Sequence, residues 1–220
     1  MIIAKSQSPS ETGVKYHVIT AEELRAAKLP MPPERCLTVA EYHCLVNSNA
    51  LHPSLRTELL QGSVFEKLTC GPRHETAVMQ AAAALRQSLG KAWMIRQKSG
   101  VTLDVSEVEP DIAVVPGPID RFQTSHPRPY SVELLIEISD RTIEFDRRRK
   151  LPEYAANGIV QCWLINLIDN CVEWYQQPSG STNSSHYAAR DIFNRGESVP
   201  VMIRGERLGD ITVSDLIPGN

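Results

Sequence analysis

The sequence predicts one α/β domain, or an α+β domain with the same layers, in which helices flank a mixed central β-sheet. The clearest helix covers residues 73–89, where apolar residues recur at helical spacing and Gly90 follows as a C-terminal cap. A second, charged helix is expected over residues 145–157, ending at Gly158. Short apolar runs bounded by turn residues precede, separate and follow these helices, as strands do. A chain of 220 residues with 42% hydrophobic composition can bury one such core.

The N-terminal region, residues 1–36, contains several prolines and little periodicity. We expect a loosely structured arm there, with a short helical possibility over residues 21–28. The folded domain is expected to occupy residues 37–220.

A helix and a hairpin are predicted to open this domain. Thr38 is expected to N-cap a short helix, because Glu41 stands at the capping-box position. A hairpin should follow, since Gln61-Gly62 is a turn pair between two strand-like runs, 55–60 and 63–68.

The rest of the sheet is predicted from apolar runs after the long helix. Candidate strands cover residues 93–97, 100–103, 111–115, 132–138, 160–166, 171–175, 186–190 and 198–202. A turn rich in Gly, Ser and Pro spans residues 178–185, and a last short element precedes Pro218.

The charge balance and the apolar content exclude several classes of protein. The net charge of −3 argues against a protein that holds nucleic acid mainly by counterion release, although residues 147–150 form a local basic run. No run approaches the roughly 20 apolar residues that span a bilayer, so no membrane partner is expected. Nothing at the N-terminus is typical of a secretory signal, so a cytoplasmic location is expected. The five cysteines are widely spaced without a C-x-x-C pair, and we expect them to be reduced core residues.

Acidic residues interrupt two of the most apolar strands. Alternation along residues 132–138 places Glu133, Leu135 and Glu137 on one face and the other apolar side chains of the strand on the opposite face. Such a strand is expected to be central, where an ionised carboxylate is costly unless a metal, a cation or hydrogen bonds compensate it. Asp111 follows Pro110 and opens the other apolar strand, so it should lie at a sheet end. An Asp and a Glu on neighbouring strands form a hard oxygen site suited to Mg²⁺ or Mn²⁺.

Several segments together resemble a known family. They are E-P-D-I-A-V-V at 109–115, V-E-L-L-I-E-I-S-D at 132–140, D-R-R-R-K-L-P-E-Y-A-A-N-G-I at 146–159 and C-W-L-I-N at 162–166, with T-E-L-L-Q-G at 57–62, Pro72 to His74 and Arg96-Gln97 upstream. In this order they resemble the Uma-two-type putative restriction endonuclease family of the PD-(D/E)XK nuclease superfamily. The resemblance covers about residues 37–217 and implies a restriction-endonuclease-like core.

The resemblance also implies roles for individual residues. Asp111 and Glu137 would bind the metal. Position 139, where the superfamily commonly has lysine, is Ser139, and the resemblance assigns the role of that lysine to Lys150 on the following helix. Further candidate site residues at positions matching the family are Glu58, His74 and Gln97.

Each candidate also has a simpler structural role. Asp111 could cap or turn a strand, and Glu137 could pair with an arginine. Lys150 lies four residues after Asp146, so the two could form a surface helix pair. His74 falls on the apolar stripe of the long helix, where a buried structural histidine is the commoner outcome. Glu58 and Gln97 could simply be surface residues of their strands.

The function expected from these features is metal-dependent hydrolysis of DNA phosphodiester bonds, with Mg²⁺ or Mn²⁺ as cofactor and DNA as partner. The first alternative is a catalytically silent nuclease-fold module for nucleic-acid or protein interaction, favoured by the acidic net charge and the missing Glu-x-Lys. A weaker alternative is hydrolysis of a small phosphoester. A homodimer is expected by analogy with nucleases that cut both strands.

Overall fold

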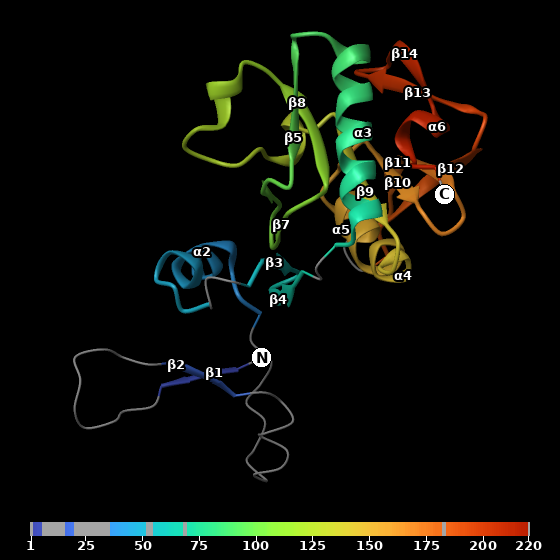
Figure 1. The fold of residues 1–220 in the computed structure, drawn as a ribbon. Coiled ribbons are helices and arrows are strands. Elements are labelled where there is room, and N and C mark those ends of the chain that lie inside the picture. The colour runs from blue at the N-terminus through green and yellow to red at the C-terminus, as the bar shows by residue number, and fades with distance from the viewer. Residues whose placement is uncertain are drawn as a thin grey trace.

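The computed structural model describes residues 2–5, 16–19, 36–51, 55–67, 70–181 and 184–219. Its central sheet has six strands in the order β12-β11-β10-β9-β8-β5 (Figure 1). These strands are β5 (Trp93–Gln97), β8 (Ile112–Pro116), β9 (Leu134–Ser139), β10 (Gln161–Asn166), β11 (Cys171–Ser179) and β12 (His186–Asn194). β9 and β10 run parallel and the other neighbours antiparallel, so the predicted mixed α/β sheet is confirmed.

Helix α3 (Pro72–Leu89) covers one face of this sheet, as Figure 1 shows. Its buried side chains form a single stripe: His74, Ala77, Val78, Ala81, Ala82, Leu85 and Leu89. Pro72 starts the helix at a position where its missing N–H costs nothing. Gly90 ends it with φ +65°, which a side chain would disfavour. The helix predicted over residues 73–89 is therefore confirmed.

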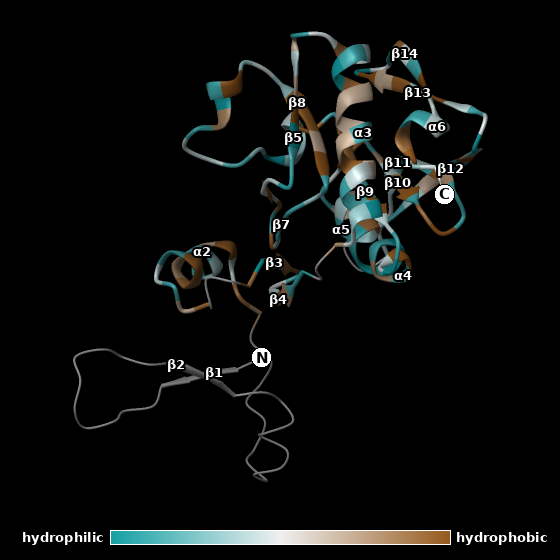
Figure 2. Ribbon diagram, viewed as in Figure 1, coloured by the Kyte–Doolittle hydropathy of each residue, from teal (hydrophilic) through white to brown (hydrophobic). Residues whose placement is uncertain are grey.

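Side chains from the sheet alternate between two hydrophobic clusters. Leu134 and Ile136 of β9 pack in the cluster that holds α3, whereas Leu135 packs in the opposite one. The α3 side is completed by β13 (Ser198–Ile203), β14 (Glu206–Thr212) and α6 (Val213–Leu216). Figure 2 shows β8 as largely hydrophobic along its length, as expected for a strand covered on both faces.

A smaller sheet has the strand order β4-β3-β7-β6, and β3 and β4 lie between α2 (Val39–Asn47) and the main body in Figure 1. Its strands are β3 (Thr57–Leu60), β4 (Ser63–Glu66), β6 (Val101–Thr102) and β7 (Glu107–Val108). The predicted capping box of α2 and the hairpin turn are both confirmed. Gln61 and Gly62 adopt φ +50° and +74°, the conformation that a two-residue hairpin turn needs.

The segment after β9 departs from the single helix predicted over residues 145–157. It consists of α4 (Ile143–Phe145), a π-helical turn (Asp146–Lys150) and α5 (Leu151–Ala156). Pro152 has no N–H to continue the α-helical pattern, and the turn before it widens so that Leu151 donates to the Asp146 carbonyl. The π-helical turn buries Asp146 and Lys150, leaves Arg148 and Arg149 exposed, and places Arg147 half-buried against Glu173.

Other predictions need correction. β1 (Ile2–Lys5) and β2 (Tyr16–Ile19) form an antiparallel pair within the predicted arm, while the helical possibility at 21–28 lies outside the described residues. β7 and β14 were not predicted, because each is short or polar. Only Cys162 and Cys171 are buried, so the expected core role is wrong for the exposed Cys36 and Cys44; none of the five cysteines is bonded to another. Within the described part of the chain, no helix combines the length and apolar character needed to cross a bilayer.

Candidate metal centre

A cavity of about 360 Å³ lies where β3, α3, the end of β9 and the π-helical turn meet. Five of the six predicted site residues line it: Glu58, His74, Asp111, Glu137 and Lys150. Gln97 is not among its lining residues, although its strand position is next to Ile112, the residue after Asp111. Residues far apart in the sequence are thus brought together at one sheet end.

Asp111 is held at the start of β8 by two donors. The Ile138 backbone N–H donates to Oδ2 at 2.9 Å, and His74 Nε2 lies 3.1 Å from the same oxygen. Burial opposes ionisation of this carboxyl, but these two interactions outweigh it and hold its pKa below the ordinary value. Both described hydrogen bonds use Oδ2, which leaves Oδ1 available to a cation.

His74 therefore contacts the candidate site although it lies on the buried stripe of α3. Burial disfavours its charged form, but the hydrogen bond and charge of Asp111 outweigh this and raise the pKa of His74. Its other ring nitrogen, Nδ1, has no hydrogen-bond partner among the described residues. We interpret His74 as a group that positions the Asp111 carboxylate.

Glu137 accepts from two side chains of the segment that follows β9. Lys150 Nζ lies 3.2 Å from Oε1, and the Tyr154 hydroxyl donates to the same oxygen. Burial raises the pKa of Glu137 to about 7; Lys150 opposes this rise and the charge of Asp111 adds to it. Asp111 lies nearby, since it accepts from the backbone N–H of Ile138, the residue after Glu137, and both carboxylates line the cavity.

Lys150 bridges the two sheets. Its Nζ lies 3.2 Å from Glu137 Oε1 and 3.2 Å from Glu58 Oε1 on β3. Burial would lower the pKa of this ammonium, but the two carboxylates outweigh it and raise the pKa, so the group stays charged. Glu58 is fixed in turn, since its Oε2 accepts from the Glu109 backbone N–H at 3.3 Å.

Ser139, at the position where lysine is usual in the superfamily, has a different role. It is fully buried, and its hydroxyl donates to Asp146, which also accepts from Thr142 at 2.9 Å. Ser139 and Thr142 thus fix the start of the π-helical turn, and that turn delivers Lys150 to the cavity.

The position of Glu133 differs from the one predicted. Glu133 precedes β9 and pairs with Arg204, whose Nε lies 2.9 Å from Oε1, so Glu133 does not share a site with Glu137. Arg204 belongs to the turn between β13 and β14 and stacks on Trp93, 5.1 Å from the ring centre. The strand begins at Leu134, two residues later than its apolar pattern indicates, so Glu133 lies outside the predicted alternation.

Two residues near the centre were not predicted, namely Asp146 and Tyr154. They lie four residues before and after Lys150, so one helical face carries all three. The spacing of Asp146 and Lys150 is equally compatible with a surface pair, so the spacing alone does not place either residue at the centre.

The donor set fits a hard divalent cation. Asp111 and Glu137 each have one carboxylate oxygen held by protein donors, and both line the cavity. A second, softer set lies beside them: Cys70, His74 and Glu75 have ligand atoms within 4.8 Å of one another. In that set, however, His74 is engaged by Asp111 and Glu75 by Lys98. We therefore regard the two carboxylates as the better candidate ligands.

A solved structure of another protein has a similar fold. A crystal structure from Anabaena variabilis, described as a putative nuclease belonging to DUF820, is similar with a TM-score of 0.58. The match covers 82% of this chain and 97% of that one at 15% sequence identity, and shows that the two share a fold. The protein thus shares its mixed α/β fold with that structure.

The sequence match is more specific. Residues 39–206 match the family model described as Uma2, putative restriction endonuclease, and the chain belongs to this family. A search of the curated proteins found no match.

Proposed function

We propose that the protein is an endonuclease that hydrolyses DNA phosphodiester bonds with Mg²⁺ or Mn²⁺ bound by Asp111 and Glu137. The observation that carries this proposal is the position of Lys150. Its ammonium contacts Glu137 within the cavity that Asp111 also lines, although the local sequence lacks the usual lysine at position 139. Family membership supports the nuclease class independently.

The chain's own residues would divide the chemistry as follows. A divalent cation, when bound, would polarise the scissile phosphate and lower the pKa of a water molecule. Lys150 would stabilise negative charge that develops on the phosphate, because its raised pKa keeps it protonated. Tyr154 and His74 would hold Glu137 and Asp111 in the orientation that receives the cation. No covalent bond between enzyme and DNA is needed.

A catalytically silent module remains the second candidate, and one observation favours it. Acidic side chains line the same cavity, namely Glu66, Asp140 and Glu144, and they would repel a phosphate backbone. Lys67, which also lines the cavity, donates to the Glu109 carbonyl and so is partly engaged.

Cleavage of supercoiled plasmid separates these candidates. Wild type and Asp111→Asn are incubated with Mg²⁺, with Mn²⁺ and with chelator, and nicked and linear products are followed on gels. The proposal expects metal-dependent cleavage by the wild type only. If the wild type shifts DNA in a binding assay but cleaves none under any metal condition, the silent module is the better account.

We also propose a homodimer and a cytoplasmic location. Two subunits with one centre each would supply one cut per strand. Five cysteines without a disulfide, two of them exposed, are compatible with a reducing compartment. Light scattering tests the first proposal, and fractionation of cells tests the second.

A further inference from the structure

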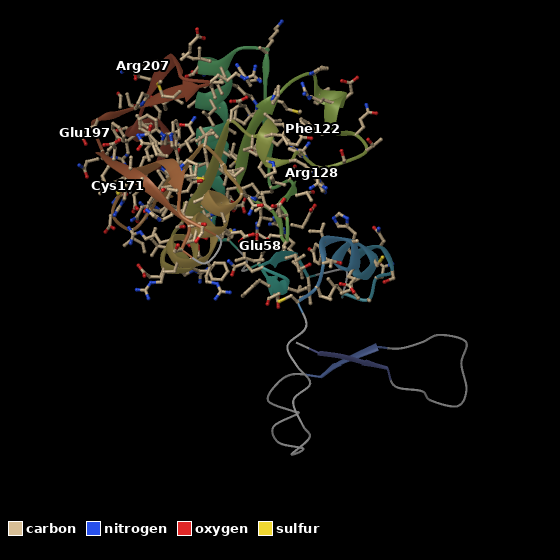
Figure 3. All side chains as sticks on the ribbon, turned by 180° about the vertical axis from the view of Figure 1, so that it is seen from behind. Glu58, Phe122, Arg128, Cys171, Glu197 and Arg207 are labelled. Atoms are coloured by element: carbon tan, nitrogen blue, oxygen red, sulfur yellow. The ribbon has the colours of Figure 1, made fainter. Side chains whose placement is uncertain are left out.

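A second cavity, of about 950 Å³, is formed by α2, β7 and the connection between β8 and β9. It is separate from the candidate metal centre: on β3, Glu58 lines the first cavity and its neighbour Thr57 lines the second. Figure 3 labels two further lining residues, Phe122 and Arg128, with α2 below them in that view.

The wall of this cavity contains a buried carboxylate whose charge has little compensation. Glu107, on β7, is only 6% exposed, and neither of its carboxylate oxygens has a hydrogen-bond partner among the described residues. A buried carboxylate is costly unless a cation or hydrogen-bond donors compensate it. Glu107 therefore has capacity for a ligand.

Two imidazoles face this carboxylate from opposite elements. His43 Nε2, on α2, lies 3.4 Å from Glu107 Oε1, and His126 Nε2, on the connection after β8, lies 3.3 Å from it. Each side chain is 45% exposed, so both rings can turn in the cavity.

The backbone that carries each histidine is fixed. The His126 ring packs on Gly100, where an added Cβ would approach it within 2.9 Å, and the next residue, Pro127, accepts from the Thr102 N–H at 3.0 Å. On α2, the Tyr42 hydroxyl donates to the Thr57 carbonyl at 2.9 Å. The cluster is therefore held by its framework and does not depend on a chance approach of surface side chains.

We propose that His43, Glu107 and His126 bind a divalent transition-metal ion of the zinc class. Two imidazoles and one carboxylate, with a further position open to solvent, form a donor set that zinc accepts. Ligand atoms roughly 2.0–2.1 Å from a tetrahedral zinc are about 3.3–3.4 Å apart, and both histidine-to-glutamate distances have this value. The two imidazole nitrogens are more than 4.8 Å from each other, so zinc binding must draw the rings together.

The arginines that line this cavity do not neutralise the Glu107 carboxylate. Arg96 and Arg128 line the same cavity, but the Arg96 guanidinium stacks on Phe122, 5.7 Å from the ring centre. Among the described residues, neither arginine forms an ion pair with Glu107. The site also differs in kind from the first, because imidazole donors favour zinc whereas an all-carboxylate set favours Mg²⁺.

The test is a titration of the full-length, chelator-treated protein with zinc chloride, followed by calorimetry. It uses the wild type, His126→Ala, Glu107→Gln and, as a matched control, His186→Ala, an exposed histidine on β12. We expect the first two variants to weaken zinc binding by at least about tenfold and the control to match the wild type. Equal affinity in all four proteins would overturn the proposal.

Two further experiments test whether zinc binds at the proposed site and not elsewhere. The titration is repeated in an Asp111→Asn background, where the proposed site should bind unchanged; loss of zinc there would place the ion at the first centre and overturn this proposal but not the nuclease one. Cobalt chloride replaces zinc in an absorption experiment, because the exposed thiols of Cys36 and Cys44 could also bind a soft ion. A thiolate-to-cobalt band would reject the proposed ligands, and bands of nitrogen and oxygen ligation that disappear in His43→Ala would support them.

Thermal melting tests the remaining explanation, which is that His43, Glu107 and His126 form ion pairs and bind no metal. In that case His43→Ala and His126→Ala would lower the melting temperature of the metal-free protein, and zinc would not raise it in the wild type. This result would also overturn the proposal. A zinc site predicts instead that zinc raises the melting temperature of the wild type and that neither variant shows this rise.

Discussion

The ammonium of Lys150 lies 3.2 Å from Glu137 Oε1, thirteen residues along the chain, because a π-helical turn directs that lysine inward. The same turn leaves Arg148 on the outside, where its side chain is 79% exposed. The basic run thereby contains one buried cation, Lys150, next to two exposed arginines, Arg148 and Arg149.

Replacing Lys150 with methionine should lower metal-dependent cleavage by at least about a hundredfold, since one preorganised positive charge is lost. The chain should also lose about 3–5 kcal/mol of stability without metal, because Glu58 and Glu137 would be left as unpaired buried carboxylates. Cleavage rates and denaturant unfolding measure the two effects. Arg148→Met is the control, and equal small effects in both variants would mean that Lys150 is not part of the centre.

Mg²⁺ or Mn²⁺ should raise the melting temperature of the wild type, because it binds the native state and the ligands are separated in the unfolded chain. Asp111→Asn should remove this rise. Differential scanning fluorimetry across a metal series measures it, with Asp191→Asn on exposed β12 as the control. A metal response that persists unchanged in Asp111→Asn would exclude this aspartate as a ligand.

Replacing Ser139 with alanine should reduce both stability and cleavage, although serine carries no charge. Its hydroxyl is buried and donates to Asp146, so the substitution leaves an acceptor without its partner and costs about 1–3 kcal/mol. Unfolding in denaturant and plasmid cleavage are measured together. Ser214→Ala, at an exposed position of α6, should change neither, and a Ser139→Ala chain indistinguishable from it would refute the anchoring role.

Glu173 should make the protein more stable at neutral than at acid pH. Burial opposes its ionisation, but hydrogen bonds from Arg147 and Tyr175, the charge of Arg190 and a contact from Asn166 outweigh burial and lower its pKa. A carboxyl whose pKa is lower when folded contributes stability above its unfolded pKa and loses it as pH falls through the folded value.

The measurement is the unfolding free energy of wild type and Glu173→Gln as a function of pH. The wild type should be the more stable at pH 7, and the difference should shrink as pH falls below about 4. Glu206→Gln, at an exposed position of β14, is the control. A difference that stays constant over this range would show that Glu173 acts through packing and not through its charge.

Much of the fold could be predicted because apolar periodicity reports burial directly. The α3 stripe and the strands β5, β8, β9 and β10 follow from it, and the turn pair Gln61-Gly62 adds the hairpin. Glu133 could not be placed, since its partner Arg204 comes from a hairpin that is distant in the sequence. The π-helical turn was also missed, because helical periodicity does not show that the side chains of Ser139 and Thr142 anchor Asp146 at its start.

The candidate site could be predicted from the sequence only for residues that match the ordered motifs of the family. The resemblance indicated Asp111, Glu137 and Lys150, and the structure gathers them at one cavity. Gln97 matched a family position but does not line that cavity. His43, Glu107 and His126 carry no local motif at all, since they come from a helix, a two-residue strand and a connection that only tertiary packing brings together.

The bridge from Glu58 through Lys150 to Glu137 has a consequence for the protein while it is being made. Glu58 emerges from the ribosome early and Lys150 much later, after both strands that carry the carboxylates. A nascent chain that ends before Lys150 can neither neutralise the two buried carboxylates nor complete the proposed centre. On the proposed function, a nuclease built in this way stays harmless to nearby nucleic acid until most of its domain has been synthesised and folded.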